Sequence, residues 1–294
     1  MSIDEVQTLP GKTLTAVVSP WTGHDARELQ RRRAETVSLN SSHGFREPTL
    51  DLVRDLPATV TSIVVLARWI DDLTPLYDLG RRLTSLHLHV APGATIDLSR
   101  LPGLTSLSAD WPTVEGSLHA ATGLDDLYLG HVEAKDLTRL SSLRHLRRLS
   151  MKDRPALTSL AGLDALESLR SLTVAGGRYL VDITDLAGPV GGRLEELDLD
   201  SCRHIHDLDP LTHCGSLTEL CLANIGDVPS AAPLRSLTEL RRLFLHESTR
   251  FLDGDLSAIA GLPHLHTLSL MNRRHYHPDR RELEASLASS PDGG

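Results

Sequence analysis

The residues best suited to metal chemistry lie in one short stretch, residues 202–214, with the sequence CRHIHDLDPLTHC. The stretch holds Cys202, Cys214 and three histidines, and thiolates and imidazoles are the usual ligands of zinc. The spacing nevertheless matches neither the C-x₂₋₄-C nor the H-x₃₋₅-H frame of standard zinc sites. Ile205 occupies a core position of an internal leucine repeat, so His204 and His206 flank it on a turn. We therefore expect no metal site in this stretch.

Sequence motifs of the common enzyme classes are absent. The sequence contains no G-x-S-x-G, no P-loop, no G-x-G-x-x-G after a strand and no H-E-x-x-H. Acidic residues could act as general acids or bases only in a pocket that shifts their pKa values, and an open sheet surface does not provide one. The sequence thus predicts a non-enzymatic protein with no catalytic residues and no cofactor.

An internal repeat must position the polar side chains of this chain. The pattern L-x-x-L-x-L, with aliphatic substitutes, occurs ten times between Val60 and Leu270 at intervals of 20 to 25 residues. Its second and third apolar residues are two apart, which is the period of a β-strand, so both point to one face. The residues at the centre of the hexads are Ile63, Leu86, Leu107, Leu127, Leu149, Leu172, Leu197, Leu220, Leu243 and Leu268.

Between the hexads, leucines recur at steps of three, as in Leu137, Leu140 and Leu143. An α-helix has 3.6 residues per turn, so this spacing favours 3₁₀ turns and short helical pieces over a long α-helix. Each unit is therefore interpreted as strand, turn, short helix, turn. Repetition of such a unit predicts a solenoid, in which each repeat buries its apolar face against its neighbours.

The ends of a solenoid need caps, because a bare terminal repeat would expose its core. The sequence predicts an N-terminal capping region at 1–59, about ten repeats at 60–272 and a C-terminal cap at 273–294. Within the last of these we expect an amphipathic helix at 278–288 and a disordered tail after it.

The N-terminal capping region has its own pattern. We expect a polar helix at 24–35, a degraded first strand at 34–39 and a second helix at 48–56, with Pro48 in its first turn.

These repeats resemble the leucine-rich repeat family. The clearest unit is LEELDLDSCRHIHDLDPLTHCGS from Leu194, and LTELCLANIGDVPSAAPLRSLTE follows it directly from Leu217. The I-x-D-L-x-P-L segment at 205–211 is similar to the short bacterial and protein-phosphatase-regulator type of repeat. The resemblance implies an α/β fold: a curved arc with a parallel β-sheet on the concave face and short helices and 3₁₀ turns on the convex face. It also implies a role in binding proteins.

One position departs from the family's pattern. Members usually carry Asn three residues after the last leucine of the strand, where its side chain bonds backbone groups of the turn. Here that position is occupied by Arg68, Ala91, Pro112, Val132, Arg154, Gly177, Cys202, Ile225, Ser248 and Arg273. Only Cys202 and Ser248 are familiar substitutes. We therefore expect irregular turns whose amides are satisfied by backbone or water.

Two groups of side chains stand out on the predicted concave face, where equivalent positions of adjacent strands form columns about 4.8 Å apart. The first group combines an acidic patch with a basic and aromatic one: Glu196, Asp198, Asp200 and Glu219, then Arg242, Phe244 and His246. The second is Tyr128, Arg148 and Lys152. Aromatic residues and Arg are enriched at binding hot spots, so these groups predict a protein- or peptide-docking surface with a charge dipole along the arc. Exposed strand residues that serve only solubility are the alternative.

The composition limits the possible partners. The net charge is -9, from 39 acidic and 30 basic side chains, which argues against nucleic acid or an anionic membrane as the partner. No stretch approaches the ~20 apolar residues that span a bilayer, and the N-terminus carries acids where a signal peptide carries bases. Three cysteines, an odd number, favour free thiols, and the preference for Arg over Lys is typical of a GC-rich bacterial genome. The sequence predicts a bacterial, cytoplasmic protein.

The preferred hypothesis is a sensor, adaptor or regulatory subunit that binds a protein or peptide on its concave face. The alternative is an accessory factor that presents a peptide substrate to a partner enzyme. A metal-dependent enzyme that uses residues 202–214 is a third hypothesis. The sequence identifies neither the partner nor the pathway.

Overall fold

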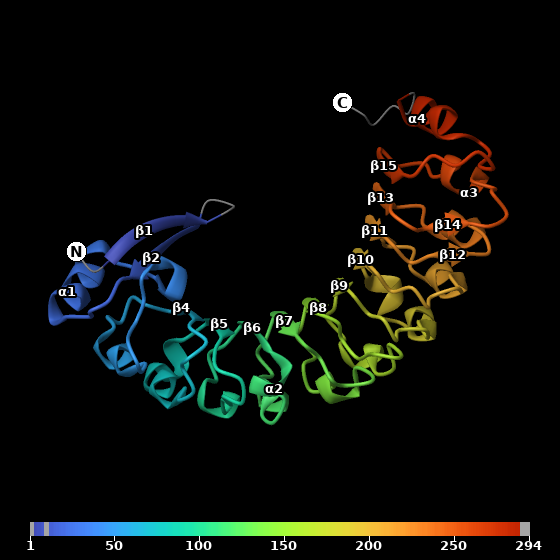
Figure 1. Cartoon of the computed structure of the whole chain (residues 1–294). Coiled ribbons are helices and arrows are strands. Elements are labelled where there is room, and N and C mark those ends of the chain that lie inside the picture. The colour runs from blue at the N-terminus through green and yellow to red at the C-terminus, as the bar shows by residue number, and fades with distance from the viewer. Residues whose placement is uncertain (1–2, 9–11, 289–294) are drawn as a thin grey trace. The chain divides into compact units, whose positions relative to one another are not determined.

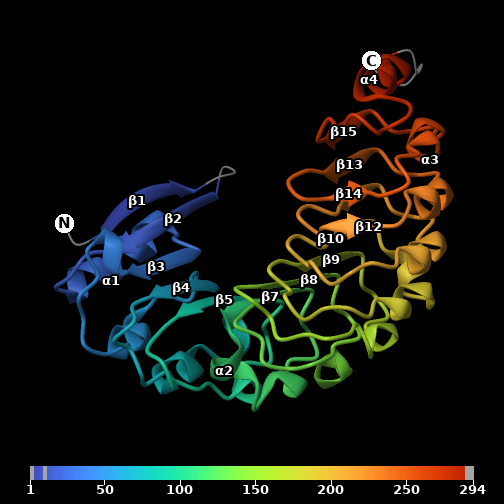
Figure 2. The ribbon, with the colours of Figure 1, turned by 45° about the vertical axis from the view of Figure 1, so that its right-hand side comes forward.

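The computed structural model describes residues 3–8 and 12–288, so the tail predicted to be disordered, 289–294, lies outside the described residues. The chain forms two compact units, Met1–Leu129 and Gly130–Gly294. In each unit the strands line the inner, concave side, and the short helices lie on the outer side (Figure 1). A view from another angle shows the same division of strands and helices within each unit (Figure 2).

The first unit contains a sheet whose strands follow one another in chain order. Its strands are β1 (Ile3–Thr8), β2 (Lys12–Val17), β3 (Thr36–Asn40), β4 (Ser62–Leu66), β5 (Ser85–His89), β6 (Ser106–Asp110) and β7 (Asp126–Gly130). β1 and β2 are antiparallel, and from β2 to β6 the strands pair in parallel. The register places Ile63 beside Leu86 and Leu86 beside Leu107, as the repeat predicts.

The second unit continues the same pattern. Its strands are β8 (Arg148–Lys152), β9 (Ser171–Val174), β10 (Glu196–Asp198), β11 (Glu219–Cys221), β13 (Arg242–Leu245) and β15 (Thr267–Leu270), which pair in parallel in this order. The register joins the central leucines of the six hexads in a row, from Leu149 to Leu268. Each of the ten predicted hexads thus forms a strand.

Short 3₁₀ helices connect the strands on the outer side of each unit. They span Ser41–His43, Asp51–Asp55, Thr74–Arg82, Leu98–Arg100, Leu118–Ala120, Thr138–Leu140, Leu163–Ala165, Thr184–Ala187, Gly191–Arg193, Asp209–His213 and Ala232–Ser236. The α-helices are α1 (Gly23–Arg32), α2 (Trp111–Val114), α3 (Ser257–Ala260) and α4 (Arg280–Ala288). Leu137, Leu140, Leu143 and Leu146, at steps of three, are all at most 2% exposed. Their burial confirms the predicted solenoid of strands and 3₁₀ turns, because three residues per turn keep every third side chain on the core side.

The structure corrects several predicted elements. α1 ends at Arg32, before the predicted end at residue 35, and β3 forms five paired positions with β4 and is therefore not degraded. Of the helix predicted at 48–56 only Asp51–Asp55 is helical, as a 3₁₀ helix. The physical reason is again the spacing of three, because Leu50, Val53 and Leu56 are all buried.

Two further pairs of strands were not predicted. The β1–β2 hairpin begins the sheet of the first unit. In the second unit β12 (Asp227–Val228) and β14 (Arg250–Phe251) form a small separate sheet.

Side chains satisfy backbone groups at two turns of the second unit. The Cys202 thiol donates to the carbonyl of Val174 at 3.4 Å and accepts from the amide of Gly177. The Thr249 hydroxyl accepts from the amide of Ile225 at 3.2 Å and donates to the carbonyl of Leu222 at 2.5 Å. Cys202 thus bonds a turn as expected of a familiar substitute for Asn, whereas the expectation that backbone or water satisfies the turn amide is wrong for Ile225. The second substitute is Thr249, one residue beyond the predicted Ser248.

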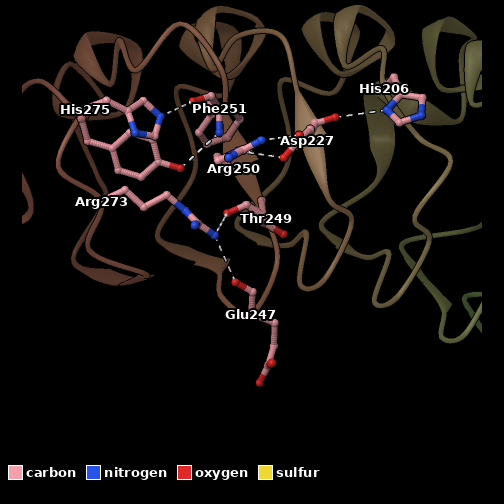
Figure 3. A network of polar contacts seen from close by, with 9 residues as sticks. His206, Asp227, Glu247, Thr249, Arg250, Phe251, Arg273 and His275 are labelled. Carbon is pink, nitrogen blue, oxygen red and sulfur yellow. Dashed lines mark hydrogen bonds and ion pairs between the residues drawn. The ribbon is translucent and has the colours of Figure 1, made fainter.

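Polar side chains also join successive repeats beside the β12–β14 sheet (Figure 3). The Arg250 guanidinium donates through Nε to the Asp227 carboxylate at 2.8 Å, and His206 Nδ1 lies 3.1 Å from the carbonyl of Asp227. Arg273 Nη2 donates to the carbonyl of Thr249 at 3.1 Å. His275 Nε2 lies 2.9 Å from the backbone carbonyl of Phe251. Each of these basic side chains therefore contacts a backbone carbonyl or a carboxylate of a neighbouring repeat.

Candidate functional site

Seven of the ten predicted site residues come together on three adjacent strands of the second unit. The register aligns Glu196 with Glu219 and Glu219 with Arg242. Two residues further along the strands, it aligns Asp198 with Cys221 and Cys221 with Phe244. Asp200 and His246 follow the ends of β10 and β13. We call this surface the β10–β13 patch; it comprises Glu196, Asp198, Asp200, Glu219, Arg242, Phe244 and His246.

The alternation of the strands exposes this patch. Leu197, Leu220 and Leu243 are at most 1% exposed, because they point into the core of the repeat. Their neighbours on either side point to the opposite face of the sheet. Glu196 and Arg242 are exposed, whereas the other five residues of the patch are partly exposed.

The acidic and basic parts of the patch meet in an ion pair. The Arg242 guanidinium contacts the Glu219 carboxylate of the adjacent strand, with the two side chains 50% and 31% exposed. Such exposed pairs stabilise a protein by only about 0–1 kcal/mol, so the pair orients Arg242 more than it stabilises the sheet. Since Arg242 offsets the charge of Glu219, the remaining negative charge of the patch lies on Glu196, Asp198 and Asp200.

Asp198 has the least favourable environment of the three. The Cys221 thiol and the backbone amide of Asp200 donate hydrogen bonds to its carboxylate, but Oδ1 is buried and has no hydrogen-bond partner among the described residues. Burial raises the pKa of Asp198 above its ordinary value of 3.8, and the negative charge of Asp200 raises it further. A donor supplied by another molecule would satisfy Oδ1 and stabilise the ionised form.

Cys221 belongs to the same row and is a poor nucleophile. Burial and the neighbouring Asp198 carboxylate raise the pKa of its thiol to about 12. Because the thiolate is the reactive form, this thiol is suited to donating a hydrogen bond to Asp198 and not to covalent chemistry.

The second predicted group is not brought together within one unit. Tyr128 lies on β7 in the first unit, whereas Arg148 and Lys152 belong to β8 in the second. Arg148 and Lys152 are the first and last residues of β8, so about 13 Å of strand separates them. Both side chains are exposed.

The cysteines and histidines of residues 202–214 do not converge. Cys202 and Cys214 are buried in the core, and their thiols lie 3.4 Å and 3.6 Å from backbone carbonyls. Burial raises the pKa of each thiol to about 12. His204 and His206 are exposed on the turn, as the repeat predicts. Within residues 3–8 and 12–288 no group of three or more His, Cys, Asp or Glu side chains could hold a metal ion.

A groove in the first unit was missed by the sequence interpretation. Its volume is about 780 Å³. Its lining includes hydroxyl and imidazole groups of successive strands, among them Ser38, Ser62, Ser85, His87, Ser106 and Ser108. The recurrent Ser directly before the central residue of a hexad, as at Ser62, Ser85 and Ser106, is the sequence signal that could have indicated it.

None of the helices in the described part of the chain has the length and apolar character needed to cross a membrane.

Comparison with known proteins supports the fold. No protein-family model matches the sequence, and neither does any curated protein. Among solved structures, an internalin of Listeria monocytogenes is similar over 77% of this chain and 73% of its own, with 21% identity and a TM-score of 0.51. A leucine-rich repeat protein of Leptospira interrogans is similar over 84% of this chain and 69% of its own, with 17% identity and a TM-score of 0.57. The mouse RP105/MD-1 complex contains a chain that is similar over 81% of this one and 42% of its own, with 21% identity and a TM-score of 0.56.

Proposed function

The chain has the leucine-rich repeat fold, and from that fold we propose that it is a non-enzymatic module that binds a protein or peptide. We assign the binding surface to the β10–β13 patch on the exposed face of the sheet. The observation that carries this assignment is Asp198, a half-buried carboxylate whose Oδ1 has no partner among the described residues.

The chemistry of the patch suggests what the partner presents. Asp198 and Asp200 together attract a cation, and a Lys or Arg side chain would also supply the donor that Oδ1 lacks. Phe244 and Arg242 lie two strands away on β13, and aromatic and Arg side chains are the types that dominate binding energy at interfaces. The partner we propose is therefore a protein segment with a basic side chain next to an apolar one.

The similar structures favour the same class of function. The structure of RP105 with MD-1 is described as a complex, so one protein of this fold is found bound to another. Its chain is more than twice as long as the part matched here, so it supports only the general role. A role as sensor, adaptor or regulatory subunit remains our hypothesis.

We also propose that residues 1–59 and 273–294 cap the repeats between them. The pairing of β2 with β3 supports the first cap. The burial of Leu283 on α4 supports the second, because an apolar side chain there covers part of the last repeat.

The test is capture of a partner by the immobilised full chain, followed by measurement of its affinity for purified variants. The double variant D198N/D200N keeps the size of both side chains and removes two negative charges. We expect it to bind the captured partner at least about tenfold more weakly, because it loses two charged contacts.

The matched control is E133Q/E239Q. Glu133 and Glu239 are exposed residues outside the patch, and their replacement changes the net charge by the same amount. Equal weakening by both variants would indicate a general charge effect, and unchanged affinity of D198N/D200N would exclude the β10–β13 patch as the interface.

A further inference from the structure

A basic cavity lies at the turns that follow β8, β9 and β10 in the second unit. Its volume is about 490 Å³, and it is lined by Arg154, Gly176, Arg178, Ser201, Arg203 and His204. The three arginines come from three consecutive repeats. None of the lining residues belongs to the β10–β13 patch.

The repeat itself brings these arginines together. Arg154, Arg178 and Arg203 each lie three or four residues after the last apolar residue of their hexad, so the solenoid stacks their turns one above the other. Strands in a sheet are about 4.8 Å apart, and the turns that follow them keep a similar spacing. The stacking therefore places three long basic side chains around one space.

The backbone of these turns is held in place. Arg154, Gly176 and Ser201 have positive φ values of 64°, 76° and 57°, which marks a tight change of direction after each strand. The amide of Gly176 donates to the carbonyl of Asp200 at 2.9 Å, and the amide of Ser201 donates to that of Ala223 at 2.9 Å. Bonds between repeats thus hold the backbone of two residues that line the cavity, Gly176 and Ser201.

The charge of the cavity is not balanced from within. No carboxylate lines it, and in the described part of the chain the side chains of Arg154 and Arg178 have no ion-pair or hydrogen-bond partner. Among the described residues, the Arg203 guanidinium donates to a single side chain, the neutral Asn224 amide, at 3.3 Å. Other arginines of the same unit do have acidic partners, as Arg144 has Glu167. In a chain with a net charge of -9, three adjacent arginines without an acid are a surface that favours an anion.

We propose that this cavity binds a phosphate monoester. Three guanidinium groups offer more donors and more positive charge than one carboxylate can use, whereas a phosphate dianion has the charge and the oxygens to contact all three. The Ser201 hydroxyl and the His204 ring lie at the same cavity and add polar contacts. A volume of about 490 Å³ also accommodates the group that carries the phosphate. This inference is independent of the proposed protein-binding role.

The test is isothermal titration calorimetry of the full chain with inorganic phosphate at pH 7.5 and low ionic strength, where surface charges are least screened. We expect saturable binding with one site per chain. The variant R154Q/R178Q/R203Q should bind at least about tenfold more weakly, because it loses the charged hydrogen bonds. The single variant R178Q should show a smaller loss in the same direction, and it keeps the test valid if the triple variant does not fold.

The matched control is R235Q/R241Q/R274Q, which removes three exposed arginines from other places in the same unit and changes the net charge equally. It should bind phosphate as the wild type does. Equal losses in both triple variants, absence of binding to the wild type, or tighter binding of N-acetylglutamate than of phosphate would overturn the proposal.

Two further probes distinguish the sources of the phosphate. Tighter binding of O-phosphoserine than of glucose 6-phosphate would support the site and assign it to a phosphorylated protein side chain. The reverse order would support the site and assign it to a soluble metabolite.

Discussion

Cys202 and Thr249 show what a single side chain must do in the turns of this chain. Each accepts a hydrogen bond from a backbone amide and donates one to a backbone carbonyl of the preceding repeat. A thiol and a hydroxyl each carry one donor and at least one acceptor, so both meet this requirement. The family's Asn is therefore replaceable by chemically different residues, which a comparison of residue types alone does not reveal.

Asp198 shows the opposite case, a side chain that the fold leaves in an unfavourable state. Because its pKa in the native state is raised above the ordinary 3.8, the native state binds its proton more tightly than the unfolded state does. Its contribution to stability is therefore fully present below pH 3.8 and is lost as the pH rises through the native pKa. The ionised carboxylate therefore destabilises the fold relative to the protonated one.

We predict that D198N is more stable than the wild type at pH 7, and that the difference shrinks as the pH falls towards 3.8. Urea unfolding at several pH values measures this. D182N is the control with the opposite sign, since hydrogen bonds from Thr184 lower the pKa of Asp182 and its ionised form stabilises the native state. A D198N variant less stable than the wild type at pH 7 would contradict the prediction.

At the scale of the element, the turn after β9 depends on close packing. A Cβ atom at Gly177 would lie 2.9 Å from Cys202 Sγ and 3.0 Å from Val174 Cγ1, both closer than a normal contact. The thiol that bonds the turn therefore requires the absence of a side chain at residue 177. Glycine at this position is a consequence of the neighbouring repeat and not of the local backbone alone.

We predict that G177A lowers the free energy of unfolding by about 1–3 kcal/mol, the usual effect of overpacking. G215A is the matched control, because a Cβ atom there meets nothing within 4 Å. Its stability should stay the same or rise slightly, since Ala restricts the unfolded chain. Chemical denaturation of both variants gives the comparison, and similar losses in the two would mean that crowding at Gly177 is not the cause.

At the scale of the whole molecule, stability comes from rows of leucines that each repeat shares with its neighbours. Leu220 on β11 is 0% exposed and lies between Leu197 and Leu243, whereas Leu268 on the last strand is partly exposed. In a solenoid each repeat contacts only its neighbours, so a terminal strand has fewer apolar contacts to lose. The same substitution should therefore have different effects along the row.

We predict that L220A lowers the free energy of unfolding by about 2–5 kcal/mol and that L268A has a clearly smaller effect. Thermal or urea unfolding of the two variants measures the difference. Equal losses would show that β15 is covered as fully as the strands inside the row.

The strands and their facing residues could be predicted because they depend on local spacing. Apolar residues two apart define a strand face, and leucines three apart define a 3₁₀ turn, as Leu197 and Leu140 illustrate. The β1–β2 hairpin, the β12–β14 sheet and the role of Thr249 were missed. Each depends on contacts between residues that lie outside the L-x-x-L-x-L hexads, and the hexad pattern does not specify those contacts.

The amino-acid sequence by itself determined the repeat, the register of its strands and the face on which each candidate side chain lies, because these follow from periodicity within about 25 residues. Only the tertiary structure decided which of those side chains interact. The Arg242 pair with Glu219, the desolvated Asp198 and the cavity of three arginines each join residues about one repeat apart. Their contacts depend on burial and on the direction of side chains across neighbouring turns. Those properties arise only when the repeats are stacked, since a local pattern specifies the face of a residue but not its neighbour.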